Sequence, residues 1–210
     1  YYEILTHIGL GEKVLNMRIF LSVLVLIFSL QSWTKADDIR DFEIEGISIG
    51  DSLLDYFSSK EIVELKNYYS GGYIFSSKKF YSITFVNHNE FSKYEDLQFI
   101  LKDNDINYNI YAIQGIINYT KISNCIKELK NIEIDLDKIF TNSQKINRNK
   151  LDHRSDLTGK ATIERFGYFI GNNTIMVSCA DYSDNEKFNI KDALRVAIRA
   201  EEFNRFLSKN

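Results

Sequence analysis

Proline is absent from this sequence of 210 residues, and glycine (10), cysteine (2) and tryptophan (1) are scarce. Loops normally use proline because its φ angle is fixed, so fold physics does not explain its absence. A surplus of positive charge is lacking too, since 26 Lys and Arg stand against 29 Asp and Glu, for a net charge of −3. Such a chain has little with which to neutralise phosphates, which argues against nucleic acid or anionic lipid as its partner.

Several catalytic motifs are also missing. The sequence contains no GxSxG nucleophile elbow, no HExxH zinc motif, no phosphate-cradling glycine loop and no GxGxxG after a predicted strand. Each of these motifs places a nucleophile, a metal or a phosphate by local backbone geometry, so their absence excludes the enzyme classes that depend on them. What remains is an ordinary globular composition, 44% hydrophobic and 26% charged, which fits one or at most two domains.

The N-terminal region has the pattern of an export signal. Met17 and Arg18 precede an apolar run over residues 19–30, too short for a membrane span and typical of a secretory signal peptide. Thr34 and Ala36 are small residues at the −3 and −1 positions of a cleavage site. We therefore expect residues 1–16 to be translated leader, residues 17–36 to be a cleaved signal peptide, and the mature protein to be periplasmic or secreted. An uncleaved N-terminal anchor is the alternative.

Cys125 and Cys179 both survive the expected cleavage. An even cysteine count in an exported chain favours a disulfide. Cys125 lies on the apolar stripe of a predicted helix, and Cys179 shares one face of a predicted strand with Ile175 and Val177, so both sulfurs are expected at one helix–sheet interface. Two buried free thiols and a reactive thiol are the alternatives. The sequence predicts no metal site and no cofactor, because the cysteines lack CxxC spacing or a neighbouring histidine.

The first half of the mature chain changes from helical to strand patterning. A helix capped near Asp51 or Ser52 is followed by a second helical stretch over residues 60–66, which ends at Gly71 and Gly72. Apolar residues then alternate with polar ones, as in half-buried strands. The predicted strands cover residues 81–85, 97–101 and 108–119. The last is apolar on both faces and is expected to be central, with a bulge or a close backbone approach at Gly115.

The second half repeats this order. Ser123 is the expected N-cap of a helix whose apolar residues recur with a 3.6-residue period up to Phe140. Residues 141–161 are polar without a period and are predicted to be a long loop. Strands are predicted over residues 163–170, 174–179 and 193–198, and a short helix over 201–208. Gly171 to Asn173 has hairpin chemistry.

These elements predict an α+β fold in which an antiparallel sheet packs on one or two helices. The order of one helix and three strands occurs twice, which admits a tandem duplication with halves 46–120 and 121–210. The alternative is a single α+β domain over residues 37–210.

The segment 41–57 (DFEIEGISIGDSLLDYF) carries two resemblances. Its Gly-Ile-Ser-Ile-Gly-Asp before short helices, with the helix-then-meander order, resembles the small envelope modules typified by outer-membrane-assembly lipoproteins and by tandem inhibitor domains of similar topology. The lipid-bearing cysteine of the lipoproteins is missing here. From Met17 to Asn210 the chain is also similar to short exported proteins of unknown function from AT-rich marine alphaproteobacteria. This similarity implies export and no particular activity.

Two groups of side chains are candidates for a site. The only histidines after the expected cleavage are His88 and His153, and the polar loop that contains Asp152, His153, Arg154 and Asp156 combines residue types used in hydrolysis. Neighbours in one loop rarely form a triad, so a solvated turn is the simpler interpretation. The tyrosines Tyr68, Tyr69 and Tyr73 flank the Gly71–Gly72 turn and form a possible exposed patch for a partner.

Taken together, the sequence favours an exported, non-catalytic module that binds another envelope protein. It does not name the partner and predicts no nucleic acid and no integral membrane span after signal cleavage. The alternatives are an envelope enzyme of the hydrolase type that uses His153 and Asp156, and a protein that binds a small ligand in a cleft lined by tyrosines.

Overall fold

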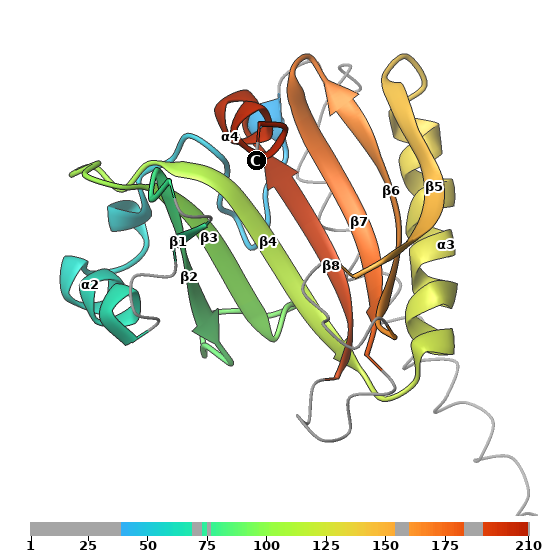
Figure 1. Cartoon of the computed structure of the whole chain (residues 1–210), viewed down its shortest axis with the longest axis horizontal. Coiled ribbons are helices and arrows are strands. Elements are labelled where there is room, and N and C mark those ends of the chain that lie inside the picture. The colour runs from blue at the N-terminus through green and yellow to red at the C-terminus, as the bar shows by residue number, and fades with distance from the viewer. Residues whose placement is uncertain (1–38, 69–72, 75–76, 154–159, 183–190, 210) are drawn as a thin grey trace, which may run out of the picture. The chain divides into compact units, whose positions relative to one another are not determined.

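Seven long strands and one two-residue strand form a single antiparallel sheet (Figure 1). The structure is a computed structural model that describes residues 39–68, 73–74, 77–153, 160–182 and 191–209, so the expected leader and signal peptide lie outside it. The strands are β1 (Tyr73–Ile74), β2 (Phe80–Val86), β3 (Asp96–Lys102), β4 (Ile110–Tyr119), β5 (Gln144–Asp152), β6 (Thr162–Ile170), β7 (Asn173–Asp181) and β8 (Asp192–Arg199). Their order is β1-β2-β3-β4-β8-β7-β6-β5.

The helices are short except for one. Two 3-10 segments, η1 (Ile39–Asp41) and η2 (Leu53–Asp55), precede α2 (Ser59–Tyr68), α3 (Ile122–Ile139) and α4 (Glu201–Leu207). Ser52 caps η2 as expected, because its hydroxyl accepts from the N–H of Leu54 at 3.2 Å. Ser58 and Glu61 form a capping box at α2, in which each side chain accepts from the other's backbone N–H. Among the described helices, none is both long enough and apolar enough to cross a membrane.

Helix α3 begins two residues earlier than predicted and without the expected cap. Its N-cap is Lys121, which makes no side-chain capping bond, and Ser123 lies inside the first turn. The predicted apolar stripe is nevertheless the buried one, with Cys125, Leu129, Ile132 and Leu136 facing the sheet. Burial of the stripe outweighs the choice of cap, since packing supplies most of a helix's stability in a folded protein.

Each half of the sheet is a meander of consecutive strands, and the last strands of the two meanders pair at the centre. In that pairing Gly115 of β4 lies opposite Val196 of β8. The prediction that residues 108–119 form a central strand is confirmed. The order of one helix followed by a meander occurs twice, but each meander has four strands instead of three.

The prediction of a loop over residues 141–161 is wrong, because residues Gln144–Asp152 form the edge strand β5. Most of its side chains are exposed on both faces of the sheet, so no alternation of polar and apolar residues marks it in the sequence. Lysine and arginine side chains and a register shift between Ile146 and Asn149 are typical of strands that must not pair with another molecule.

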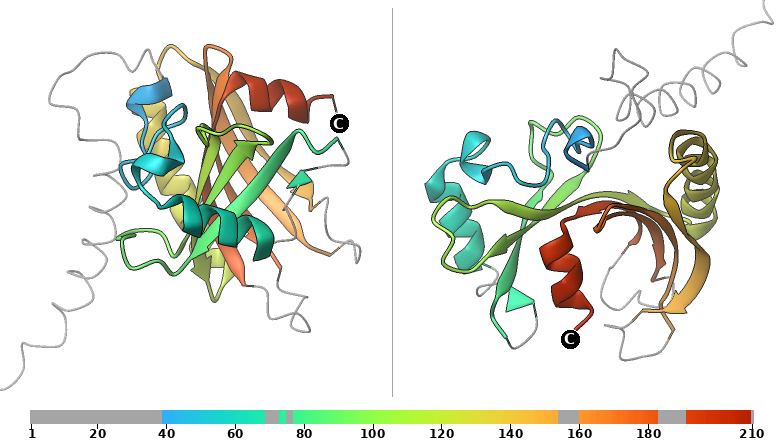
Figure 2. Two further views of the ribbon diagram at one scale, coloured as in Figure 1. Left: turned by 90° about the vertical axis from the view of Figure 1, so that its left-hand side faces the viewer. Right: turned by 90° about the horizontal axis from the view of Figure 1, so that it is seen from above.

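The two faces of the sheet differ in what covers them (Figure 2). Helices α2 and α3 lie on the convex face, where Phe57 stacks on Phe85 at a ring distance of 3.9 Å and Phe140 packs on Tyr168 at 4.8 Å. Of the described helices only α4 lies on the concave face, where Phe203 and Phe206 pack on Phe80. The predicted α+β fold, an antiparallel sheet packed on helices, is therefore confirmed.

Gly115 permits a close approach, as the sequence suggested, and the neighbour is a side chain. A Cβ atom at this position would lie 2.5 Å from the ring of Tyr94, which is buried. The register shift in this part of the sheet lies between Ile100 and Leu101 of β3 and not at Gly115.

Turns without proline use residues that tolerate a positive φ. Asn87, Asn104 and Gly171 have φ values of 46°, 63° and 60° and lie in the β2–β3, β3–β4 and β6–β7 connections. Asparagine and glycine reach this region at the lowest steric cost. Gly171 and Asn172 form a two-residue hairpin turn, because Ile170 and Asn173 are paired across it.

Candidate functional site

The two cysteines are joined by a disulfide between α3 and β7. Cys125 and Cys179 have Cα atoms 5.9 Å apart and are 0% and 1% exposed. They meet at the predicted helix–sheet interface, and neither is a free thiol. A thiol needs an accessible, electropositive environment to be reactive. The pair therefore fastens α3 to the sheet and supplies no nucleophile.

The predicted tyrosine patch lies largely outside the described residues. Tyr69 is not described, and for Tyr68 and Tyr73 only the backbone is, at the end of α2 and in β1. The predicted patch therefore lies outside the residues whose side chains the structure describes.

The predicted polar loop is partly a strand. Asp152 ends β5, and the next residue, His153, continues the pairing through its N–H, which donates to the carbonyl of Ala161 at 2.8 Å. Arg154 and Asp156 lie outside the described residues. A partner of His153 follows directly after β7, since its Nε2 shares a hydrogen bond of 2.7 Å with the hydroxyl of Tyr182.

Tyr182 joins His153 to an arginine on the central part of the sheet. Its hydroxyl also accepts from Nη2 of Arg195 at 3.2 Å, and its backbone N–H donates to the carboxylate of Asp192 at 2.8 Å. The N–H bond to Asp192 is buried and holds the end of β7 against the start of β8. These bonds orient the guanidinium of Arg195 over the concave face.

Where no described helix lies over it, the concave face is largely polar. Strand alternation places on it a set of half-buried side chains, which are Thr84, Gln98, Gln114, Ile116, Arg165, Ser178, Arg195 and Arg199. We call this set the open face. In its first half, the amide of Gln114 donates to that of Gln98, which donates to the hydroxyl of Thr84, each at 3.4 Å.

Three arginines occupy the second half of the open face. Arg165 of β6 and Arg195 of β8 lie opposite Ser178 of β7, one on each side, so the three residues form one line across the sheet. The Nε atoms of Arg165 and Arg195 are buried and have no hydrogen-bond acceptor among the described residues. Burial, and then the positive charge of nearby Arg165, lower the pKa of Arg199 to about 10.

The arginines were not among the residues singled out from the sequence, although a signal for two of them was present. Arg195, Ala197 and Arg199 alternate with Leu194, Val196 and Ile198, which predicts a strand with a polar face. Which residues of other strands share that face depends on register, and register between strands far apart in the chain is not visible in the sequence.

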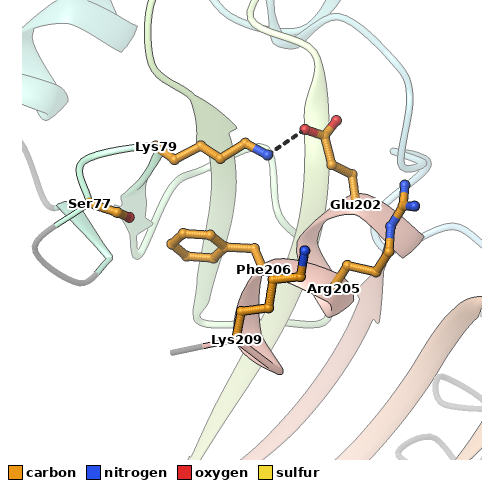
Figure 3. A pocket seen from close by; sticks show the side chains of 6 residues that line it. All are labelled: Ser77, Lys79, Glu202, Arg205, Phe206 and Lys209. Atoms are coloured by element: carbon orange, nitrogen blue, oxygen red, sulfur yellow. Dashed lines mark ion pairs between the residues drawn. The ribbon is translucent and has the colours of Figure 1, made fainter.

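A pocket of about 410 Å³ lies beside α4 (Figure 3). Its residues are Ser77, Lys79, Glu202, Arg205, Phe206 and Lys209. Lys79 reaches Glu202 at 2.9 Å, and Lys102 reaches the same carboxylate at 3.1 Å. The bond from Lys79, with a further one from Lys102, holds the pKa of Glu202 below its usual value. The carboxylate thus pairs with both lysines, and the group ties α4 to the sheet.

A salt-bridge network lies on the opposite side of the molecule. Lys145 of β5 pairs with Glu133 and Asp137 of α3, and Arg148 pairs with Glu133 and with Glu164 of β6. Every cation in this network has a carboxylate within 3.3 Å. The network holds the edge strand against the helix and offers no free charge to a ligand.

Among the described residues, no group of three or more His, Cys, Asp or Glu side chains is placed to hold a metal ion. Comparison with known proteins adds no further constraint. Neither a protein-family model, nor a curated protein, nor a solved structure matches this chain.

Proposed function

We propose that this protein is an exported, non-catalytic module that binds an acidic segment of another envelope protein through the open face of its sheet. The observation that carries the proposal is the unequal cover of the sheet. Both α2 and α3 lie on the convex face (Figure 2). Strand register places three arginines among the polar side chains in the middle of the concave face.

Charge supports an acidic partner. The chain as a whole is acidic, with a net charge of −3, yet none of the described carboxylates forms an ion pair with Arg165, Arg195 or Arg199. A local positive surface attracts acidic partners.

The chemistry of the open face supports binding over turnover. Guanidinium and amide groups donate and accept hydrogen bonds, but they do not exchange protons near neutral pH. A hydrolase would need a nucleophile held by a general base, and the ring nitrogen of His153 that could serve as one is engaged with Tyr182.

Export is supported by two independent features. The disulfide persists in an oxidising compartment such as the periplasm, and it is rare in the cytosol. The predicted signal peptide over residues 17–36 implies the same route.

The test is site-specific photo-crosslinking in cells that express the full chain. A photoreactive benzoylphenylalanine replaces Gln114 on the open face, and a matched control replaces Ile134, which is 56% exposed on α3 at the convex side. We expect an adduct of discrete mass from position 114 and none from position 134.

Reversing the charge of an arginine tests whether the open face is responsible for the adduct. Arg195→Glu is expected to abolish the adduct from position 114, whereas Arg205→Glu on exposed α4 is expected to leave it intact. Equal adducts from both positions, or an adduct that survives Arg195→Glu, would overturn the proposal. So would the absence of any adduct from position 114.

A further inference from the structure

The three arginines of the open face belong to two strands, β6 and β8, that are separated by β7. Arg165 and Arg195 share one line across β6, β7 and β8, and Arg199 lies four residues farther along β8, opposite Thr174. The line between them carries Gly167, Met176 and Ala197. Two of these three side chains are too small to separate the guanidinium groups.

Electrostatic coupling agrees with this placement. The charge of Arg165 acts on Arg199 strongly enough to lower the pKa of Arg199, after the effect of burial. Two cations that are partly removed from water repel each other more than they would in solvent. The arrangement is therefore unfavourable by itself, and a negative charge between the two groups would relieve it.

Several other cations of the described chain are paired with carboxylates. Lys66, Lys79, Lys102, Lys145, Arg148 and Arg205 each lie within 4 Å of a carboxylate. By contrast, among the described residues Arg195 donates to the hydroxyl of Tyr182, and no described carboxylate pairs with any of the three arginines. All three arginines belong to the open face.

The hydrogen-bond donors of Arg165 and Arg195 indicate which kind of acceptor would fit this site. The Nε–H groups of Arg165 and Arg195 are buried without an acceptor among the described residues. A guanidinium presents Nε–H and a terminal N–H as parallel donors, which fit the two oxygens of a carboxylate or phosphate. Buried donors of this kind are almost always satisfied in functional complexes.

We infer that Arg165, Arg195 and Arg199 form an oxyanion-binding site on the open face, and that its occupant is a carboxylate of the partner protein. The inference rests on the proposed function for the source of the carboxylate. Ser178, between Arg165 and Arg195 on β7, adds a hydroxyl to the same line.

The test uses the purified, oxidised chain and two probes at constant ionic strength, a capped tetraglutamate peptide and inorganic phosphate. Two-dimensional NMR of the arginine side chains follows the Nε–H signals of Arg165 and Arg195. We expect both signals to shift on addition of the peptide, while that of Arg205, which is paired with Glu201, stays in place.

Variants measure the contribution of each group. R165Q/R199Q is expected to weaken binding of the peptide at least tenfold, and R205Q, which removes one exposed charge, to change it less than twofold. Arg165→Lys keeps the charge and loses the Nε–H, and it is expected to weaken binding as well. The NMR titration of the unaltered chain remains informative if a variant fails to fold.

Three results would overturn the inference. They are unshifted Nε–H signals with both probes, an equal loss of affinity in R205Q and R165Q/R199Q, and saturable binding of phosphate with none of the peptide. The third refutes the carboxylate as occupant. If the peptide does not bind while position 114 still gives its crosslink, the oxyanion site is refuted and the proposed function stands.

Discussion

At the scale of single residues, Gly115 lets the buried ring of Tyr94 pack directly against the backbone of β4, because glycine has no side chain. We predict that Gly115→Ala destabilises the protein by about 1–3 kcal/mol, because the new Cβ overlaps the buried ring of Tyr94. Urea unfolding measures the change. In a Tyr94→Ala background the penalty of Gly115→Ala should be nearly abolished, and an undiminished penalty would show that the ring is not the cause.

Tyr168 makes a hydrogen bond whose value depends on pH. Its hydroxyl donates to Asp137 at 2.7 Å, and the bonds from Lys145 and then Tyr168 hold the pKa of Asp137 below its usual value. A carboxyl whose pKa is lowered by folding contributes stability above its unfolded pKa and loses it as the pH falls through the folded value. The contribution is therefore full at neutral pH and declines below about pH 4.

We accordingly predict that Tyr168→Phe lowers the free energy of unfolding by about 1 kcal/mol between pH 5 and 7, a modest value because the side chain of Asp137 is 45% exposed. The difference from the unaltered protein should shrink as the pH falls from 4 to 3. Denaturant unfolding across this range provides the measurement, and Tyr111→Phe serves as the control. A difference that does not vary with pH would contradict the role given to Asp137.

At the scale of elements, the disulfide fastens the longest helix to the sheet. It closes a loop of 54 residues, for which the loop-entropy estimate is about 4 kcal/mol of stabilisation. We predict that a reductant lowers the unfolding midpoint of the unaltered chain but does not change that of a Cys125→Ala/Cys179→Ala variant. Thermal unfolding with and without reductant tests this, and an unaltered chain insensitive to complete reduction would contradict it.

The elements also show which local patterns predict structure. Strand and helix positions were predicted well wherever one side of the element is buried, as in α3 and in β2, β3 and β7. Strand β5 was not predicted because most of its side chains face solvent on both sides of the sheet, so its sequence has no apolar alternation. Its polar and charged residues instead protect the edge of the sheet from pairing with another molecule. The cap of α3 was misplaced for a related reason, since burial of the stripe sets where the helix lies.

At the scale of the whole molecule, the two meanders share one sheet through β4 and β8. We predict that they unfold together, because the eight residue pairs between these strands make the core continuous. Ile83→Val, a buried change in the first meander, should lower the urea midpoint by the same amount in both meanders. Residue-specific NMR signals from residues 80–119 and 122–199 provide the two readouts. A shift confined to residues 80–119 would show that the meanders unfold separately.

The candidate site was the least predictable feature at this scale. His153 was singled out from the sequence with its loop neighbours Asp152 and Asp156, for which a solvated turn was the simpler interpretation and a hydrolytic site the alternative. The structure instead pairs it with Tyr182, 29 residues away, which connects it to Arg195. A hydrogen bond between distant segments depends on strand register, which no local pattern encodes.

The sequence by itself determined the alternation of the strands, the apolar stripe of α3 and the placement of both cysteines at one buried interface. These features are local, because side-chain direction follows from the period of each element. Only the tertiary structure decided that β5 joins the sheet, that α2 and α3 cover one face of the sheet, and that Arg165 meets Arg195 and Arg199 on the other. These outcomes depend on pairing between distant strands, which is selected by the energy of the whole core.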